Sequence, residues 1–328
     1  MKIAFFDTQK FERSTFLAAN ASRHEINFIE ARLDETTTSL AAGCDVVCCF
    51  VNDRVDRTVI EKLAGQGVRL VAARSAGFNH IDTKALSEFH IKLITVPEYS
   101  PHAVAEHAVA LLQTLNRKIH KAHNRVHDLN FSLDGLVGFD LFGKTVGVIG
   151  TGRIGKAFCQ IMNGFGMKIL AVDSAPDTTW AKSHNVRYVE LTELLQKSDV
   201  VSLHVPLTPE THHIINTPAI DKMKKNVILI NTSRGGLIET KGLIKALKLR
   251  TLGGACLDVY EEESGIFFSD HSETGVNDDL LARLITFPNV LITSHQGFLT
   301  NEALTNIATT TIANITKFEN GKAETTKI

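Results

Sequence analysis

Three short polar clusters in the last third of the chain combine residue types that can bind a carbonyl compound and move a proton. Arg234 stands in ILINTSRGG and His295 in VLITSHQGF, while ACLDVYEEES contains Asp258 and the glutamates 261–263. Arginine offers a fork of donors to a carboxylate and polarises an adjacent carbonyl, and an imidazole exchanges a proton near neutral pH. Each cluster directly follows an apolar, strand-like segment. We therefore expect the three clusters at the carboxyl ends of strands, where α/β proteins place their sites.

A glycine turn indicates which cofactor accompanies that chemistry. Gly150, Gly152 and Gly155 in VGVIGTGRIGKAF have G-x-G-x-x-G spacing between an apolar strand and a helix. The first allows a sharp turn, the second lets the backbone approach a pyrophosphate, and the third lets strand and helix pack closely. Asp173 ends the next strand-like segment, KILAVD, where it can accept hydrogen bonds from ribose hydroxyls and repel a 2′-phosphate. The pattern predicts a dinucleotide site that prefers NAD to NADP; the alternative is a purely structural turn.

The elements that must position these residues alternate between strands and helices. Ten apolar, strand-like segments are separated by helical patterns, which is typical of an α/β fold with parallel sheets covered on both faces. Ten strands suit two Rossmann-like or flavodoxin-like domains better than one sheet. Residues 100–126 predict one long helix that crosses between the domains, and residues 299–322 predict a final helix.

The return of the final helix to the first domain would make the second domain an insertion. The prediction is then an NAD-binding Rossmann domain of residues 100–298, inserted in a substrate domain made of residues 1–99 and 299–328, with the site in the cleft.

Composition excludes several other classes of protein. The formal charge of −1 and pI near 6.9 leave no basic excess for nucleic acid. No apolar run approaches the ~18 residues that span a bilayer, and the first residues become polar too soon for a signal peptide. The five cysteines contain no CxxC pair, so neither a disulfide framework nor a metal site is expected. We expect a cytoplasmic protein with a small-molecule substrate, and neither nucleic acid nor membrane as partner.

On these elements the sequence resembles the D-isomer-specific 2-hydroxyacid dehydrogenase family, and within it the NAD-dependent fermentative D-lactate dehydrogenases. The resemblance covers nearly the whole chain. It rests on six segments: RSAGFNHID from Arg74, VPEYSPHAVAEHA from Val96, VIGTGRIG from Val148, INTSRGG from Ile230, LDVYEEE from Leu257 and SHQGFLTNEAL from Ser294.

The resemblance implies a catalytic role for three residues. Arg234 would bind the carboxylate and carbonyl of a 2-oxo acid, and His295 would donate a proton in reduction or accept one in oxidation. Glu263 matches the family's acid, five residues after the aspartate of LDVY, and would hold the other ring nitrogen of His295 and favour the protonated form. The similar formate dehydrogenases have glutamine in this role, so a carboxylate favours a hydroxy-acid or oxo-acid substrate.

The resemblance also implies the binding residues. Backbone N–H groups of Ala76 and Gly77 would grip the substrate carboxylate, and Phe50, Tyr99 and Phe298 would form the pocket walls. Thr211 stands where relatives often have asparagine near the cofactor. Beyond the glycine turn and Asp173, the implied cofactor contacts are Arg153, Ile154, Val205, Pro206, Thr211, Thr232, Ser233 and Asp258, the last accepting from the nicotinamide amide.

The predicted function is the NADH-dependent, reversible reduction of pyruvate to D-lactate, because large rings near a small substrate leave room for a methyl group. A dehydrogenase for a bulkier D-2-hydroxy acid, such as 2-hydroxyisocaproate or phenyllactate, is the alternative enzyme. 3-Phosphoglycerate is disfavoured, since no basic cluster adjoins SAGFN. An NAD-sensing corepressor that retains the same three residues is the alternative binding protein. Relatives are dimers or tetramers, so we expect a homo-oligomer, with the apolar helix from Pro101 as its interface.

Overall fold

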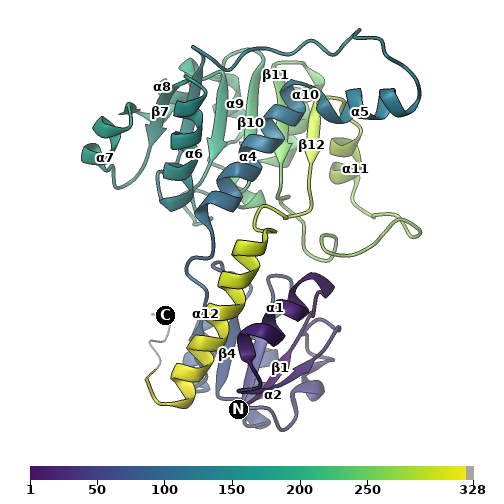
Figure 1. Cartoon of the computed structure of the whole chain (residues 1–328), viewed down its shortest axis with the longest axis vertical. Helices are drawn as coiled ribbons and strands as arrows, with labels where there is room; N and C mark the ends of the chain where they lie inside the picture. Colours follow the sequence, from purple (N-terminus) through teal and green to yellow (C-terminus); the bar gives the residue numbers. More distant parts are fainter. Residues whose placement is uncertain (323–328) are drawn as a thin grey trace. The chain divides into compact units, whose positions relative to one another are not determined.

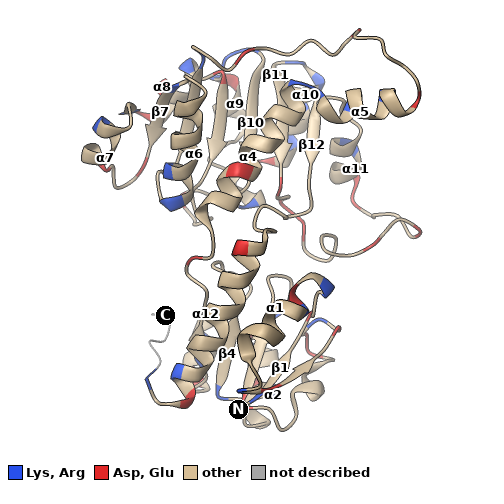
Figure 2. Ribbon diagram, in the orientation of Figure 1, with Lys and Arg blue, Asp and Glu red and all other residues tan. Residues whose placement is uncertain are grey.

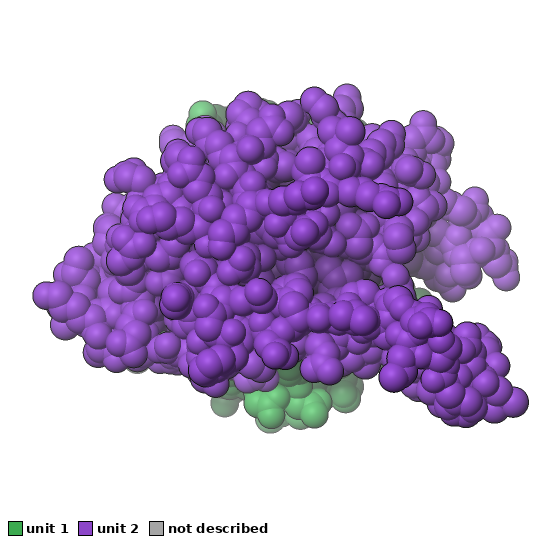
Figure 3. Space-filling model, turned by 90° about the horizontal axis from the view of Figure 1, so that it is seen from above, with its two compact units in different colours: residues 1–100, 298–328 green, residues 101–297 purple. Residues whose placement is uncertain are grey.

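The computed structural model describes residues 1–322 and has an α/β fold with two parallel sheets. The chain divides into two compact units, coloured separately in Figure 3. Unit 1 consists of Met1–Ser100 and the segment that begins at Phe298, and unit 2 consists of Pro101–Gly297. The division differs by one residue at each boundary from the one expected from the sequence.

Unit 1 is a five-stranded sheet in the order β2-β1-β3-β4-β5, with helices on both faces. Helices α1 and α12 contribute to the apolar cluster on one face, and α2 and α3 to the cluster on the other. The strands are β1 (Lys2–Phe5), β2 (Glu25–Phe28), β3 (Val46–Cys49), β4 (Leu70–Ala73) and β5 (Lys92–Ile94). The helices are α1 (Lys10–Asn20), the short 3-10 helix η1 (Thr38–Ala41), α2 (Arg57–Gly65), α3 (Thr83–Glu88) and α12 (Asn301–Glu319).

Helix α12 explains why the first and last parts of the chain share one unit. Its apolar residues Ala303, Ile307, Ile312 and Ile315 are all buried, and the helix packs beside α1 (Figure 1). Since burial of an apolar side chain is worth about 1.5–3 kcal/mol, this stripe holds the C-terminal helix on the N-terminal sheet. Unit 2 is therefore an insertion between two parts of unit 1.

Unit 2 contains a seven-stranded parallel sheet in the order β12-β11-β10-β9-β6-β7-β8. The direction of winding reverses between β6 and β9, which is the point at which doubly wound sheets bind nucleotides. The strands are β6 (Thr145–Ile149), β7 (Lys168–Val172), β8 (Val186–Tyr188), β9 (Val200–Leu203), β10 (Val227–Asn231), β11 (Leu252–Leu257) and β12 (Val290–Ile292).

Two groups of helices cover the faces of this second sheet. Helices α4 and α6 pack on one face, whereas α8, α9, α10 and α11 pack on the other. The helices of unit 2 are α4 (Pro101–Asn116), α5 (Ile119–His127), α6 (Arg153–Gly164), α7 (Thr178–Ser183), α8 (Leu191–Lys197), α9 (Thr217–Asp221), the 3-10 helix η2 (Gly235–Leu237), α10 (Thr240–Lys248) and α11 (Asp279–Ile285). None of the helices within residues 1–322 is long and apolar enough to cross a lipid bilayer.

The prediction of one long helix over residues 100–126 was wrong, because the chain forms α4 and α5 with a break between them. Lys118, at the start of α5, has a left-handed backbone with φ of 52°. At the end of α4 the side chain of Asn116 donates to the carbonyl of Phe139 at 2.8 Å and accepts from its N–H at 2.9 Å. This pairing with a distant segment fixes the last turn of α4, and the chain then leaves in a new direction.

Candidate active site

The three polar clusters lie at the carboxyl ends of three adjacent strands of unit 2. Arg234 follows β10, Glu263 follows β11 and His295 follows β12, and these strands are neighbours in the sheet. Because all strands of the sheet are parallel, their carboxyl ends share one edge. The sheet order thus brings to one edge three loops that are distant in the sequence.

A network of short hydrogen bonds shapes the turn that carries Arg234. The Asn231 side chain accepts from the N–H of Ser233 at 3.0 Å and donates to the carbonyl of Arg234 at 2.8 Å. The guanidinium of Arg234 donates from Nη1 to the carbonyl of Ser233 at 2.6 Å. A Cβ at Gly235 would lie 2.0 Å from the carbonyl group of Tyr260, so only glycine lets this turn pack against the loop after β11. The backbone around Arg234 is therefore well defined.

Glu263 and His295 contact each other directly. The distance between Glu263 Oε1 and His295 Nδ1 is 2.7 Å, and Glu263 Oε2 accepts from the N–H of Tyr260 at 3.0 Å. The carboxylate oxygen accepts, so Nδ1 carries a hydrogen and Nε2 is the ring nitrogen left for a substrate. Of the neighbouring acids, Glu261 pairs with His213 instead and Glu262 is exposed. The pair can hold and orient one exchangeable proton.

Asp258 holds the loop that carries His295. Its carbonyl accepts from the N–H of His295 at 2.7 Å, and His295 has a left-handed backbone with φ of 51°. Its carboxylate is buried, with 1% of the residue exposed. The partners of the carboxylate are the N–H groups of Gln296 at 2.9 Å and Gly297 at 2.8 Å, the hydroxyl of Thr293 at 2.6 Å and Nε2 of His107 at 3.2 Å.

These contacts also set the charge of Asp258. Burial is the largest single effect and raises its pKa, but hydrogen bonds from His107, Thr293 and Gln296 together outweigh burial and hold the pKa below its ordinary value. Asp258 is thus a charged anchor for the loop of residues 293–297. The sequence suggested only an acceptor for the nicotinamide amide at this position, and it missed both the anchoring role and the partner His107.

The glycine turn after β6 fits a pyrophosphate. Gly150 has φ of 94°, and a Cβ there would lie 2.5 Å from the carbonyl oxygen of His204. A Cβ at Gly155 would lie 2.0 Å from the carbonyl oxygen of Gly150. At Gly152, by contrast, a Cβ would meet nothing within 4 Å, and this residue is the N-cap of α6 without a side-chain cap. The space beside Gly152 is therefore open where α6 begins, which suits the approach of an anionic group to the N-terminus of the helix.

Asp173 at the end of β7 has the charge that a ribose-binding acid needs. Its Oδ2 accepts from the N–H of Thr151 at 2.6 Å and from the Thr151 hydroxyl at 2.8 Å, and its Oδ1 accepts from the N–H of Ala175 at 2.9 Å. Burial, the largest effect, raises its pKa, but these hydrogen bonds and the charge of Lys156 bring the pKa below the ordinary value. The negative charge would repel a 2′-phosphate.

The remaining predicted cofactor residues lie along the same edge of the sheet. Arg153 and Ile154 open α6, and Val205 and Pro206 follow β9. The other polar side chains make local contacts: Thr211 donates from its hydroxyl to the carbonyl of Pro206 at 2.6 Å, and Ser233 donates to the carbonyl of Leu203 at 2.8 Å. The hydroxyl of Thr232 is buried and has no hydrogen-bond partner among the described residues. An unpaired buried hydroxyl at this edge fits the binding of a polar cofactor.

In unit 1, the predicted pocket walls form an aromatic cluster around Phe298. The ring centroids of Phe50 and Tyr99 lie 6.3 and 6.4 Å from that of Phe298, and Phe11, which the sequence did not indicate, lies 6.2 Å away. These edge-on and tilted arrangements are favourable for aromatic rings. The cluster gathers four aromatic rings in one place within unit 1.

The loop of Ala76 and Gly77 follows β4, and the buried ion pair between Arg74 and Glu12 holds the backbone just before it. Ser75 donates from its hydroxyl to the carbonyl of Gly77 at 2.7 Å. The neighbouring Arg74 is 1% exposed, and its Nη2 and Nε atoms each lie 3.0 Å from the carboxylate of Glu12. Breaking such a buried pair typically costs about 3–5 kcal/mol, so the anchor is strong. In the sequence Arg74 stood out only as the first residue of RSAGFNHID, and no pattern indicated Glu12 as its partner.

Comparisons with known proteins place these features in a family. The model of the D-isomer specific 2-hydroxyacid dehydrogenase NAD-binding domain matches residues 109–297. A 2-hydroxyacid dehydrogenase homolog of Haemophilus influenzae is 50% identical over 98% of this chain and 97% of its own length. D-lactate dehydrogenase of Escherichia coli is 47% identical over 98% of both chains. The solved pyruvate reductase of Chlamydomonas reinhardtii has a TM-score of 0.93 at 43% identity, covering 98% of this chain and 97% of that one.

Proposed function

This chain belongs to the D-isomer specific 2-hydroxyacid dehydrogenase family, with the family's NAD-binding domain in unit 2, and we propose that it reduces pyruvate to D-lactate reversibly with NADH. The observation that carries the proposal is the contact between Glu263 and His295 at 2.7 Å, made by the loops after β11 and β12, with the Arg234 turn after the adjoining strand β10. Such a set supplies the proton and the carboxylate-binding charge that the reduction of a 2-oxo acid requires.

In this proposal each residue acts at a defined atom. NADH, when bound, supplies a hydride for the carbonyl carbon. His295 donates the proton on Nε2 to the ketone oxygen, which becomes the hydroxyl, and in the reverse direction Nε2 accepts that proton. Glu263 stabilises the protonated imidazole through Nδ1 and fixes its orientation. Arg234 binds the substrate carboxylate with its planar fork and polarises the carbonyl, which lysine could not do with the same geometry.

The preference for pyruvate rests on the aromatic cluster of unit 1. We assign the grip on the substrate carboxylate to the N–H groups of Ala76 and Gly77, and the apolar wall to Phe50, Tyr99 and Phe298. Bulky rings favour a methyl side chain over a longer one. The alternative substrate is a bulkier D-2-hydroxy acid.

Steady-state kinetics with three 2-oxo acids test the proposal. We expect kcat/KM with NADH to be at least about tenfold higher for pyruvate than for 2-oxoisocaproate or phenylpyruvate, since one methylene in an apolar pocket is worth about 1–3 kcal/mol. A stereospecific assay should find D-lactate as the product. A higher kcat/KM for either larger acid would establish the alternative substrate class, and no NADH oxidation with any of the three would refute a dehydrogenase of 2-oxo acids.

A homo-oligomer is the second part of the proposal. The apolar stripe of α4, which the sequence suggested as an interface, is buried against α6 and the sheet of unit 2. The better candidate is the segment after α4, in which seven large apolar side chains are each at least 51% exposed. These side chains are Ile119, Val126, Leu129, Phe131, Leu133, Val137 and Phe142. A patch of this kind marks an interaction surface, and a second copy of the chain is the occupant we propose.

The oligomer can be tested by a charge within the patch. Leu133→Asp places a carboxylate at a side chain that is 79% exposed, and Leu249→Asp makes the same change outside the patch at 64% exposure. In analytical ultracentrifugation Leu133→Asp should lower the molecular mass of the particle, whereas Leu249→Asp should match the unchanged protein. If the wild-type protein were a monomer, or if Leu133→Asp had the same mass as a wild-type oligomer, the proposal that this patch is the interface would be contradicted.

A cytosolic location is the third part. All five cysteines are free, and four of them, Cys48, Cys49, Cys159 and Cys256, are buried. Free, buried thiols suit a reducing compartment. Fractionation of cells that express the tagged chain would test this location.

A further inference from the structure

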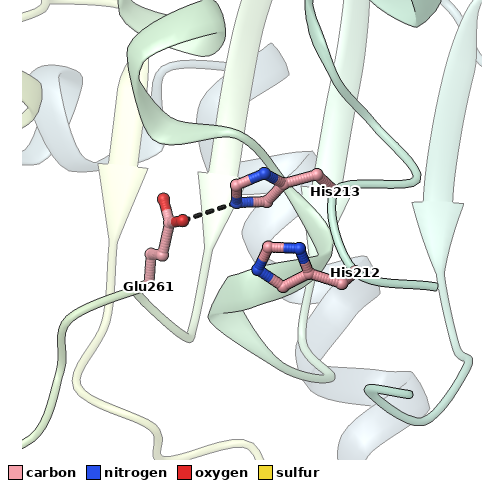
Figure 4. Close-up of side chains that lie close together, drawn as sticks. All are labelled: His212, His213 and Glu261. Atoms are coloured by element: carbon pink, nitrogen blue, oxygen red, sulfur yellow. Dashed lines mark hydrogen bonds and ion pairs between the residues drawn. The ribbon is translucent and has the colours of Figure 1, made fainter. Parts of the chain in front are cut away.

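We propose that His212, His213 and Glu261 form a binding site for a divalent transition metal of the zinc type, separate from the residues assigned to catalysis. The two histidines lie in the segment between β9 and α9, and the glutamate follows β11. Figure 4 shows both imidazole rings on one side and the carboxylate facing them. The nitrogen and oxygen ligand atoms of the three residues all lie within 4.8 Å of one another.

The donor set is the one that zinc prefers. Two imidazole nitrogens and one carboxylate oxygen, with a further position open, are found in zinc sites at metal–ligand distances of about 2.0–2.2 Å. At those distances neighbouring ligand atoms stand roughly 3–3.5 Å apart. When zinc binds, the 2.5 Å contact between His213 Nε2 and Glu261 Oε1 must therefore widen slightly. The exposed ring of His212 must also turn toward the metal. Both changes are side-chain rotations.

Backbone contacts hold the three residues in place. His213 has a left-handed backbone with φ of 52°, and its N–H donates to the carbonyl of Gly236 at 2.9 Å. The N–H of His212 donates to the carbonyl of Thr208 at 2.8 Å. One oxygen of Glu261 accepts from the N–H of Thr240 at 3.1 Å, and the other faces His213. Orientation of a ligand by such outer contacts typically raises metal affinity 10–100-fold.

A simple ion pair does not account for the whole cluster. His213 and Glu261 alone would make one, yet the ring of His212 stacks on that of His213 with centroids 3.8 Å apart and an interplanar angle of 27°. The ion pair makes no use of the second ring, whereas two imidazole nitrogens and one carboxylate oxygen make a metal-binding set. No sequence pattern announced the site, because Glu261 is 48 residues from His213.

Zinc titration of the metal-free protein tests the inference. With a chromophoric chelator as competitor, we expect the wild-type protein to bind one zinc ion per chain at this site. In His212→Gln, His213→Gln and Glu261→Gln the zinc affinity of the site should be at least tenfold lower. His212 is exposed, so its variant should fold even if the others do not. Zinc should also raise the melting temperature of the unchanged protein more than that of the variants.

A second pair of histidines supplies the control. His123 and His127 stand one turn apart on α5 with their Nε2 atoms 3.2 Å apart, and this exposed pair could hold zinc by itself. The double variant His123→Gln, His127→Gln should keep the zinc assigned to the cluster. The inference would be overturned if zinc binding disappeared only in this double variant or stayed the same in His212→Gln. It would also be overturned if the wild-type protein bound no zinc. None of these outcomes depends on enzymatic activity.

Discussion

Replacing Glu263 by glutamine isolates the charge of the carboxylate that contacts His295. Glutamine has nearly the same shape and keeps one oxygen that can accept a hydrogen bond at the 2.7 Å contact with Nδ1. We therefore expect the variant to fold and to bind NADH. What it loses is the negative charge that stabilises the protonated imidazole.

The size of that loss follows from the strength of the hydrogen bond. A hydrogen bond to a charged group contributes about 1.5–3 kcal/mol and a neutral one about 0.5–1.5 kcal/mol, a difference of roughly 1–1.5 kcal/mol. The side chains of His295 and Glu263 are 18% and 20% exposed, so solvent screens little of it. A difference of about 1.4 kcal/mol corresponds to a factor of ten in rate. Reduction needs the protonated ring, so the loss of the charge that stabilises it should lower kcat/KM about tenfold.

The assay is kcat/KM for NADH oxidation with pyruvate at pH 7. Glu263→Gln should be about tenfold slower than the wild-type enzyme, while its affinity for NADH in a fluorescence titration should be nearly unchanged. Glu262→Gln removes the same charge from an exposed neighbour and should keep the original kcat/KM. An undiminished kcat/KM in Glu263→Gln, or an equal loss in Glu262→Gln, would refute the role given to Glu263.

The other predictions concern the cofactor turn and the loop anchor. Gly152→Ala adds a methyl group in open space, so its free energy of unfolding in urea should stay within about 1 kcal/mol of the wild-type value, while its affinity for NADH falls at least tenfold. Gly155→Ala would place a Cβ 2.0 Å from a carbonyl oxygen, so its free energy of unfolding should be lower by about 1–3 kcal/mol or more. Asp173→Asn should raise the ratio of kcat/KM for NADPH over NADH by about tenfold, because the charge that repels a 2′-phosphate is gone; an unchanged ratio would contradict this. Asp258→Asn should cost about 2–3 kcal/mol of unfolding free energy at pH 7. The pKa of Asp258 is held below its ordinary value, so the stabilisation by its carboxylate is present above about pH 4 and is lost as the pH falls further. The difference in unfolding free energy between the wild-type protein and Asp258→Asn should therefore be smaller at pH 3.5 than at pH 7. An equal difference at both pH values would contradict the role of Asp258 as an anchor.

The strands that could be predicted from the sequence are those with continuous apolar runs. All residues of β3 and β10 are buried, and VVCC and VILIN are continuous apolar runs that mark them as interior strands. The ten predicted strands are all present. Two more, β2 and β8, form edges of the two sheets, and their short sequences, EINF and VRY, carry polar side chains on exposed positions. These polar positions interrupt the apolar run that marks the other two edge strands, β5 and β12.

Residues that act through distant contacts could not be found from the sequence. Arg234, Glu263 and His295 follow strands, so their place at the sheet edge could be anticipated from strand order alone. The partner of Asp258, His107, is 151 residues away on α4, and no spacing connects the two. The choice among three consecutive glutamates likewise depended on family resemblance, because pattern alone does not distinguish Glu261 from Glu263. Side-chain direction in an irregular loop depends on packing from several elements.

Single-turnover reduction of pyruvate by His295→Gln tests the central claim most directly. Because residue 295 has φ of 51°, His295→Asn should be measured beside it, since asparagine tolerates this backbone. In both variants NADH should bind with nearly unchanged affinity in a fluorescence titration, while the rate of NADH oxidation by bound pyruvate falls by about 10²–10⁴. Unchanged turnover in a variant that binds NADH normally would remove His295 from the mechanism.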